Sequence, residues 1–472
     1  MPLDNPNGLG PLENNFVTDV DSYKGSHHLL YRRGLNGMMA YIESRGGRYG
    51  KTVWNGLQGI LLDCFCTEIT KSMVEEAKKL FEGHGVPFPY AGWMRIVDFH
   101  KGRLPLKIRA APEGKIIPVS NVLATIECTD PELLWLLTWV ETKLMRVWYP
   151  TTVGTKSYYC KRVIWETLVK TSDDPMGELP FKLHDFGSRG ASSPESAAIG
   201  GGAHLVNFQG SDTVAAVRYM NHYYQSPMSA FSIAASEHST VLSWGANRED
   251  DSYRHAVKVL AKPGVLFAQV SDTTDLYRVV EKIWGGELKQ AIKDSGATCV
   301  IRPDSGDPLE VNLKVFGILD RTVGMTKNLK GYKVLPKYFR VIQGDGNKDE
   351  DSIGELLWGL VNQGYSITNI ALGMGGGLLQ LVNRDTQEFA MKVCAVSSEE
   401  EGWFDTFKDP KTGGGKKSKA GRLDLTFIDG EFKTIREGEG HSVLDTVYEN
   451  GRMVTTYTLD EVRANAGYEF AA

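Results

Sequence analysis

The feature that most constrains this chain is a set of seven polar clusters, most of them containing glycine, that each follow a short apolar run. They recur every 26 to 41 residues, the length of one strand–helix unit. Strands that alternate with helices form parallel sheets, and seven units in series favour a barrel over an open sheet. Because barrel strands carry chemistry at their carboxyl ends, we expect all seven clusters at one face. They are His184–Gly190, Gly210–Thr213, Ser236–Thr240, Ser271–Asp275, Arg302–Gly306, Gln343–Gly346 and Gly373–Gly377.

The segments that flank these repeats predict a smaller α+β domain. Residues 29–82 read as mostly helical, with an amphipathic helix over 74–81, and residues 104–127 read as two strands joined by a turn. Residues 386–412 contain a strand-like run and 456–467 a strand followed by a helix.

We therefore divide the chain into three segments: an N-terminal α+β domain with an arm (1–180), a catalytic β/α barrel (181–385), and a C-terminal segment (386–472) that packs with the N-terminal domain.

Bulk composition excludes several classes of protein. The net charge of −5 gives no basic field for nucleic acid, so an anionic substrate needs a local basic site. No apolar run approaches the roughly 20 residues of a membrane helix, and the polar start shows no signal peptide. The six cysteines lack a C-x-x-C spacing, which favours reduced thiols in a cytoplasmic protein. No protein-bound metal site is expected.

Two strand-end clusters suit phosphate. The glycines of Gly373–Gly377 let backbone N–H groups approach an oxoanion, and Arg384 could close on the same phosphate; a tight turn would also want glycine. In Arg302–Gly306, Arg302 suits pyrophosphate and Asp304 suits ribose hydroxyls or Mg²⁺ through water, unless the two form a structural pair. Asp345, beside Gly344, repeats this logic.

Three further features each have a functional and a structural interpretation. His238 could be a general base, a phosphate contact or a phosphorylation acceptor, or it could be structural. Phe186 could stack on a flat ring at the barrel mouth or fill the core. The basic stretch Lys411–Arg422, within the loop 408–422, could be a solvated loop or a lid that binds phosphate. A polar cluster at Asp19–Lys24 lies far from the barrel in sequence, and within it Asp21 could simply cap the following helix.

Taken together, these motifs resemble the nicotinamide phosphoribosyltransferase family. The resemblance is strong over about residues 180–425 and more diffuse over 29–180. It implies a type II phosphoribosyltransferase fold, a homodimer with active sites at the subunit interface, Mg²⁺ as cofactor and ATP as an energy source. The matching stretches are DSYK at 21–24, HDFGSRG at 184–190, AHLVNFQGSDTV at 203–214, AASEHST at 234–240, IRPDSGDP at 301–308, VIQGDG at 341–346, ALGMGGGLLQ at 371–380, FKDP at 407–410 and GRL at 421–423.

The resemblance also implies residue roles. Phe186 and the partner subunit's Tyr23 would stack on nicotinamide, Arg189 would lie at the ring edge, and Asp212 would bind the carboxamide. His238 would be the histidine that ATP phosphorylates, Asp304 would contact ribose hydroxyls, and Asp275 would help with Mg²⁺–pyrophosphate. The ribose phosphate would be held by Arg302, Gly344, Asp345, Gly375, Gly376 and Arg384, and pyrophosphate or nucleotide by Arg45, Lys408 and Lys416.

The expected reaction joins nicotinamide to the phosphoribosyl group of phosphoribosyl pyrophosphate, giving nicotinamide mononucleotide for NAD salvage. The alternative is nicotinate phosphoribosyltransferase, which shares the barrel. Asp212 argues against it, because an ionised carboxylate accepts from the carboxamide N–H₂ of nicotinamide but repels the carboxylate of nicotinate. A metal-dependent hydrolase or aldolase would want a His/Asp/Glu ligand set or a strand-end lysine. A non-catalytic signalling protein would not need Arg302, Asp304 and His238 together.

Overall fold

The protein is described by a computed structural model over residues 14–245, 247–412 and 417–467. The chain forms two compact units: unit 1 comprises residues 1–151 and 384–465, and unit 2 comprises residues 152–383 and 466–472. The grouping differs from the boundary expected at residue 180, because residues 152–180 contact the barrel segment rather than the N-terminal one. Arg384, expected at the end of the barrel, belongs to unit 1.

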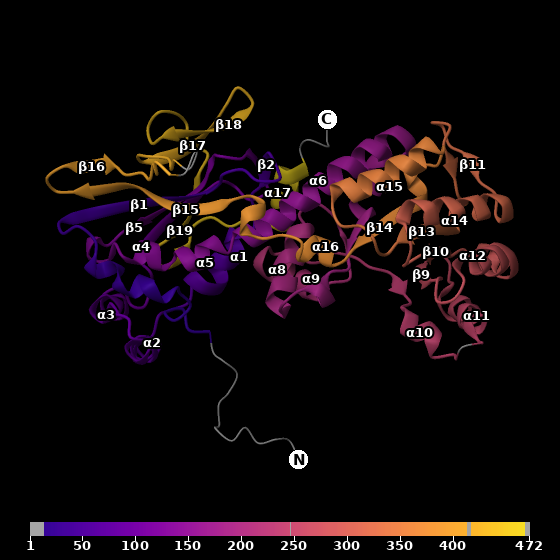
Figure 1. The fold of residues 1–472 in the computed structure, drawn as a ribbon, viewed down its shortest axis with the longest axis horizontal. Helices are drawn as coiled ribbons and strands as arrows, with labels where there is room; N and C mark the ends of the chain where they lie inside the picture. Colours follow the sequence, from indigo (N-terminus) through magenta and orange to yellow (C-terminus); the bar gives the residue numbers. More distant parts are fainter. Residues whose placement is uncertain (1–13, 246, 413–416, 468–472) are drawn as a thin grey trace, which may run out of the picture. The chain divides into compact units, whose positions relative to one another are not determined.

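Unit 2 is built on a curled parallel sheet (Figure 1). A backbone bridge between Gly210 and Phe231 joins one edge strand to the segment that leads into the other, so the sheet nearly closes. This confirms the expected irregular β/α barrel, and each of the seven clusters lies at the carboxyl end of its strand. The strand order is β7 (Gly210–Ser211), β6 (Leu183–Asp185), β14 (Ile370–Met374), β13 (Phe339–Gln343), β10 (Thr298–Arg302), β9 (Leu266–Val270) and β8 (Ala234–Ala235).

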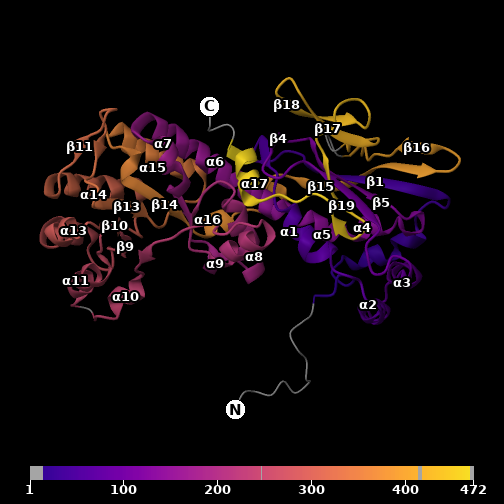
Figure 2. The same ribbon diagram turned by 180° about the vertical axis from the view of Figure 1, so that it is seen from behind.

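Helices cover the outside of this sheet, and α14 and α15 run along strands β10, β13 and β14 (Figures 1 and 2). Their starts follow local rules: Asp307 caps α14 ahead of Pro308, and Asp349 forms a capping box with Ser352 at α15. The helices are α6 (Trp148–Thr171), α7 (Pro175–Glu178), α8 (Pro194–His204), α9 (Val214–Tyr223), α10 (His238–Leu242), α11 (Glu249–Leu260), α12 (Leu276–Arg278), α13 (Lys289–Ser295), α14 (Pro308–Thr322), α15 (Glu350–Asn362) and α16 (Gly376–Leu379). A small hairpin joins β11 (Thr326–Lys327) to β12 (Lys333–Val334).

Unit 1 is an antiparallel sheet with helices packed on it. Pairing of β15 with β1 and of β19 with β3 joins C-terminal strands to N-terminal ones. The order is β16 (Gly402–Asp405), β15 (Phe389–Ser398), β1 (Leu35–Ser44), β5 (Val122–Cys128), β3 (Leu106–Ala110), β19 (Asp445–Glu449) and β20 (Arg452–Met453). Two further pairs are β2 (Lys51–Val53) with β4 (Ile116–Pro118) and β17 (Leu423–Ile428) with β18 (Glu431–Arg436). The helices are α1 (Leu57–Ile60), α2 (Lys71–His84), α3 (Tyr90–Asp98), α4 (Leu136–Trp139), α5 (Glu141–Met145) and α17 (Leu459–Gly467).

The expectation of a mostly helical segment over 29–82 is wrong for residues 35–53. β1 is buried almost along its whole length, and a strand buried on both faces loses the alternation that distinguishes it from a helix. The helix expected over 74–81 is confirmed as α2, which ends where Gly85 takes a positive φ of 79°. Of the two strands expected in 104–127, the first is confirmed as β3. The second is divided into β4, which pairs with β2, and β5, which pairs with β3.

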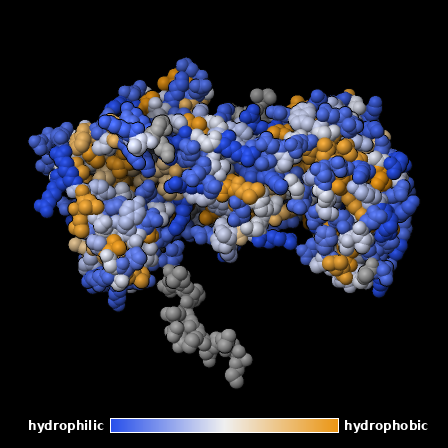
Figure 3. Space-filling model, viewed as in Figure 1, coloured by the Kyte–Doolittle hydropathy of each residue, from blue (hydrophilic) through white to orange (hydrophobic). Residues whose placement is uncertain are grey.

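The surface in view is mainly hydrophilic, with scattered apolar side chains (Figure 3). Within the described part of the chain, no helix combines the length and the apolar character needed to span a bilayer.

Candidate active site

A cavity of 670 Å³ lies in unit 2 and is lined from the strand-end clusters of the barrel. Nine of the residues expected at the site line it together, although they come from six different clusters. The structure therefore brings the predicted strand-end groups to one place. The nine are Phe186, Arg189, Asp212, His238, Arg302, Asp304, Gly344, Asp345 and Gly375.

His238 begins α10 and lies between two carboxylates. Its Nε2 is 3.1 Å from Oδ1 of Asp272, and its Nδ1 is 3.9 Å from Oδ2 of Asp304. The Asp272 side chain is only 5% exposed. Its second oxygen accepts from the Asp304 N–H at 2.9 Å and from the Ser305 hydroxyl at 2.6 Å. Asp272 thus fixes both the histidine ring and the loop that carries Asp304.

Asp272 was not predicted from the sequence, which pointed instead to Asp275 in the same cluster. The Asp275 carboxylate accepts from the Arg278 N–H at 3.0 Å and so caps α12, and Asp275 does not line the cavity. The available signal was position, because Asp272 follows the buried end of β9 by two residues whereas Asp275 directly precedes a helix.

The end of the cavity that Arg302 lines depends on the absence of a side chain at position 344. A Cβ built on Gly344 would lie 2.3 Å from Oδ1 of Asp304 and 3.2 Å from Cδ of Arg302. Arg302 Nε is 3.7 Å from that same carboxylate oxygen and, buried, has no hydrogen-bond partner among the described residues. A buried guanidinium N–H of this kind is expected to meet an anionic ligand.

The glycine cluster after β14 lies beside these groups. Gly375 lines the cavity, and a Cβ on Gly376 would meet no atom within 4 Å, so its backbone is open to approach. The Lys156 ammonium donates to the Gly377 carbonyl at 2.6 Å, which anchors the start of α16.

The opposite end of the cavity suits a flat ring. The Phe186 ring packs so closely on β14 that a Cβ on Gly373 would lie 2.1 Å from it. Asp212 is exposed at the barrel mouth, and its Oδ1 accepts a short hydrogen bond from the Ser232 hydroxyl. Burial lowers the pKa of the neighbouring His184, so its ring is neutral near pH 7. An aromatic face beside one carboxylate can recognise a ring that bears a donor.

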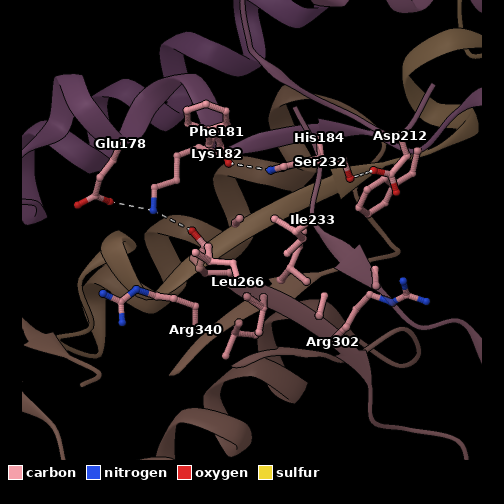
Figure 4. A pocket seen from close by; sticks show the side chains of 18 of the residues that line it. Glu178, Phe181, Lys182, His184, Asp212, Ser232, Ile233, Leu266, Arg302 and Arg340 are labelled. Atoms are coloured by element: carbon pink, nitrogen blue, oxygen red, sulfur yellow. Dashed lines mark hydrogen bonds and ion pairs between the residues drawn. The ribbon is translucent and has the colours of Figure 1, made fainter. Parts of the chain in front are cut away.

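The barrel interior contains a second, narrower space of 360 Å³ that shares Phe186, Asp212 and Arg302 with the first cavity. Figure 4 shows Asp212 and Ser232 at one end and Lys182 with Glu178 at the other. The Lys182 ammonium is 2.9 Å from Glu178 Oε2 and donates to the Ile367 carbonyl at 2.8 Å. The wall between these ends is mainly aliphatic. The volume of this space shows that the side chains of the barrel do not fill its interior completely.

Four of the expected residues lie in unit 1: Tyr23, Arg45, Arg384 and Lys408. Three of them form a cationic group with Lys392 of β15. Burial lowers the pKa of Lys392, and the charge of Glu141 opposes this shift. The charges of Arg45, Lys408 and Arg384 lower the pKa further. Lys392 was not predicted, although it is a lone lysine in an apolar strand. Lys416 lies outside the described residues.

Two family models match this chain. Residues 181–452 match the model of the nicotinate phosphoribosyltransferase (NAPRTase) family, and residues 15–108 match that of the nicotinamide phosphoribosyltransferase N-terminal domain. The nicotinamide phosphoribosyltransferase of Xanthomonas campestris pv. campestris (strain 8004) is 47% identical over 96% of this chain and 98% of that protein. That of Acinetobacter baylyi is 30% identical over 95% and 96%, respectively.

Solved structures show the same fold at low identity. The nicotinate-nucleotide pyrophosphorylase from Pyrococcus furiosus superimposes with a TM-score of 0.61 at 16% identity, covering 98% of this chain and 99% of that one. Human nicotinic acid phosphoribosyltransferase gives 0.56 at 16% identity, covering 96% and 93%. The type II phosphoribosyltransferase fold is thus confirmed, and the chain belongs to the nicotinamide phosphoribosyltransferase family of enzymes.

Proposed function

We propose that the chain transfers the phosphoribosyl group of phosphoribosyl pyrophosphate to nicotinamide, giving nicotinamide mononucleotide and pyrophosphate for NAD salvage. The observation that carries this is the single cavity that combines Phe186 and Asp212 with Arg302, Asp304 and Gly344. The most direct test is a product assay with nicotinamide and nicotinate, each with and without ATP. Nicotinate mononucleotide as the main product would contradict the proposal.

In this reaction the pyridine nitrogen of nicotinamide forms a bond to ribose C1 while the C1–O bond to pyrophosphate breaks. The electron pair of that bond leaves on pyrophosphate, so the transition state has oxocarbenium character. No protein nucleophile is needed at C1. Catalysis comes from alignment of the two reactants and from neutralisation of the leaving group. Arg302 would contact the phosphates of the substrate, and the Asp304 carboxylate would contact the ribose hydroxyls.

Mg²⁺ would enter with the pyrophosphate rather than through a dedicated protein site. Among the described residues, no group of three or more His, Cys, Asp or Glu side chains converges as a metal cage. Mg²⁺ commonly uses one or two carboxylates together with substrate phosphates and water. Asp304 and Asp345, both in the cavity lining, could supply these carboxylates. When bound, the ion would neutralise charge on the leaving pyrophosphate.

His238 is proposed to accept a phosphoryl group from ATP. Asp272 Oδ1 would accept a hydrogen bond from the Nε2–H of the ring, a tautomer that leaves the Nδ1 lone pair as the nucleophile. Nδ1 would form a bond to the γ-phosphorus of ATP while the bond from that phosphorus to the β,γ-bridging oxygen breaks, releasing ADP. The Asp272 carboxylate would stabilise the positive charge that the ring acquires.

We expect His238→Ala to lose all ATP stimulation, so that the ratio of rates with and without ATP falls to about 1. Asp272→Asn keeps the hydrogen-bond geometry but removes the charge, and we expect partial loss. The measurement is the initial rate of nicotinamide mononucleotide formation, paired with mass spectrometry of an acid-labile phosphohistidine. Full stimulation in His238→Ala would rule out the proposed role.

The cationic group of Arg45, Arg384, Lys392 and Lys408 is proposed to bind phosphate groups. Arg384 would hold the ribose phosphate, and Arg45 and Lys408 would hold pyrophosphate or the ATP phosphates. The positive charges of Arg45, Lys408 and Arg384 disfavour the charged form of Lys392, and a polyanion bound among these groups would relieve that repulsion. With Arg384→Ala we expect the KM for phosphoribosyl pyrophosphate to rise about tenfold or more, while the KM for nicotinamide changes little. Arg321→Ala, which removes an exposed arginine of α14, is a control. Equal changes in both KM values would exclude Arg384 from phosphate binding.

A homodimer with Tyr23 contributed to the partner's base site is also proposed. The Tyr23 side chain is 60% exposed, yet its segment is anchored: Lys24 is buried and its ammonium is 2.5 Å from Glu141. Asp21 accepts from the Thr142 hydroxyl at 2.8 Å. An exposed aromatic side chain on a fixed segment is suited to presentation to a second copy.

The six free cysteines are consistent with a protein that works in the reducing cytoplasm.

A further inference from the structure

A third cavity, of 190 Å³, lies in unit 2 between the barrel wall and helices α10 and α11. It differs from the two spaces described above in the side chains that line it. Along β9 the side chains alternate: Leu266 and Ala268 line the barrel interior, whereas Gln269 lines this outer cavity. The wall therefore places a glutamine where a sheet normally packs apolar side chains against helices.

The Gln269 side chain lines this cavity without a hydrogen-bond partner in the described part of the protein. The residue is 3% exposed, and within the described part of the chain no hydrogen bond to its side chain is formed. The hydrogen bonds of this carboxamide must therefore be completed by water or by a ligand in the cavity.

The rest of the lining defines the kind of ligand. The rings of Trp244 and His255 lie at the cavity with centroids 5.3 Å apart, and Val241 and Leu260 give aliphatic walls. The Ser236 hydroxyl oxygen accepts from the Val270 N–H at 2.8 Å, so its own hydrogen remains available. Among the lining residues, all within the described part of the chain, there is no Asp, Glu, Lys or Arg. The lining therefore suits an uncharged ligand.

We propose that this cavity is a second small-molecule site, which binds a neutral planar heteroaromatic ring through a donor–acceptor edge on Gln269. A cavity of about 150 Å³ in another protein admits benzene, so this one accommodates a six-membered ring with a substituent. Glutamine pairs in two-point fashion with an adenine edge, and a primary carboxamide on a pyridine offers the same donor and acceptor. Nicotinamide and adenine are thus the two sources of this chemistry.

Occupancy of the cavity is coupled to the active site through one short helix. Thr240 and Val241 of α10 line the outer cavity, while His238 and Ser239 of the same helix line the large one. A ring behind α10 fixes the helix that carries His238. By linkage, ligands of the two cavities change each other's affinity by the same factor.

The test uses the full-length protein labelled with 5-fluorotryptophan, with the Trp244 resonance assigned through Trp244→Phe. Nicotinamide and adenine are titrated separately to about 10 mM, which nearly saturates a site with a Kd of about 1 mM. We expect a saturable shift of the Trp244 resonance with one of the two probes, which identifies the source. The shift persists in Asp212→Ala, which weakens base binding in the barrel, and disappears in Gln269→Leu. No shift with either probe, or an equal shift in Gln269→Leu, would overturn the proposal.

Thermal unfolding supplies an independent check of the unpaired carboxamide. Gln269→Leu is expected to melt at the same temperature as the parent or higher, because the glutamine side chain makes no hydrogen bond within the protein that the substitution could remove. Gln343→Leu is the matched control, since Gln343 is equally buried but bonds to Asp345 O at 2.7 Å and accepts from Asn312 Nδ2 at 2.6 Å. It should melt several degrees lower. A comparable loss in Gln269→Leu would show that Gln269 is structural. Because neither readout involves turnover, both are independent of the proposed reaction.

Discussion

Gly344→Ala is expected to lower kcat/KM by about 10²-fold or more while leaving the protein folded. The new Cβ would lie 2.3 Å from the Asp304 carboxylate oxygen, a distance that forces this carboxylate to move by about 1 Å. A displacement of that size at a reacting centre costs on the order of 10²-fold in rate. The same movement disturbs Arg302, whose Cδ would be 3.2 Å from the added carbon.

The measurement is the steady-state kinetics for both substrates, with the melting temperature recorded for each variant. Gly317→Ala is the matched control, because it lies within α14 where an added Cβ meets no atom within 4 Å, and alanine favours a helix interior. Gly376→Ala separates two explanations. Its Cβ also meets no protein atom, so a loss of phosphoribosyl pyrophosphate binding there would report close approach of the ligand to the backbone. Wild-type kinetics in Gly344→Ala would remove the Asp304 loop from the site.

The barrel and most of its cavity could be predicted because the signal is periodic. Each apolar strand is followed by a polar cluster, and parallel strands bring such clusters to one edge whatever the details of the helices. The strand β1 could not be predicted in the same way, because burial on both faces removes the alternation of polar and apolar residues.

Choices within a cluster were less predictable. Asp272 and Asp275 are only three positions apart in the sequence. An aspartate is suited to a helix cap as well as to a catalytic loop. Which carboxylate faces His238 depends on where the strand ends and the helix starts, a boundary that sequence patterns locate poorly. Lys392 was missed for a related reason: its importance follows from the nearness of Arg45, Lys408 and Arg384, which are far from one another along the chain.

Asp212→Asn is expected to weaken the preference for nicotinamide over nicotinate by about 10²-fold. Oδ1 of Asp212 is occupied by the Ser232 hydroxyl, so the remaining oxygen meets the substituent of the base. A carboxylate accepts from the amide N–H₂ of nicotinamide and repels the carboxylate of nicotinate. Asparagine can turn its own N–H₂ toward nicotinate and remove the repulsion. Sites that pair a buried polar group with its substrate reach 10⁴-fold discrimination or more, but Asp212 is exposed at the barrel mouth, which reduces the expected effect.

The ratio of kcat/KM for the two bases, measured in competition, isolates this effect from any general loss of activity. Ser232→Ala is the informative control: it removes the hydrogen bond to Oδ1 but keeps the negative charge, so it should slow turnover of nicotinamide while preserving the preference. If the charge of Asp212 sets the preference, only the asparagine variant changes the ratio. If the geometry of the Asp212–Ser232 pair sets it, both variants change it equally, and base selection would then belong to the shape of the barrel mouth around Phe186 rather than to the carboxylate.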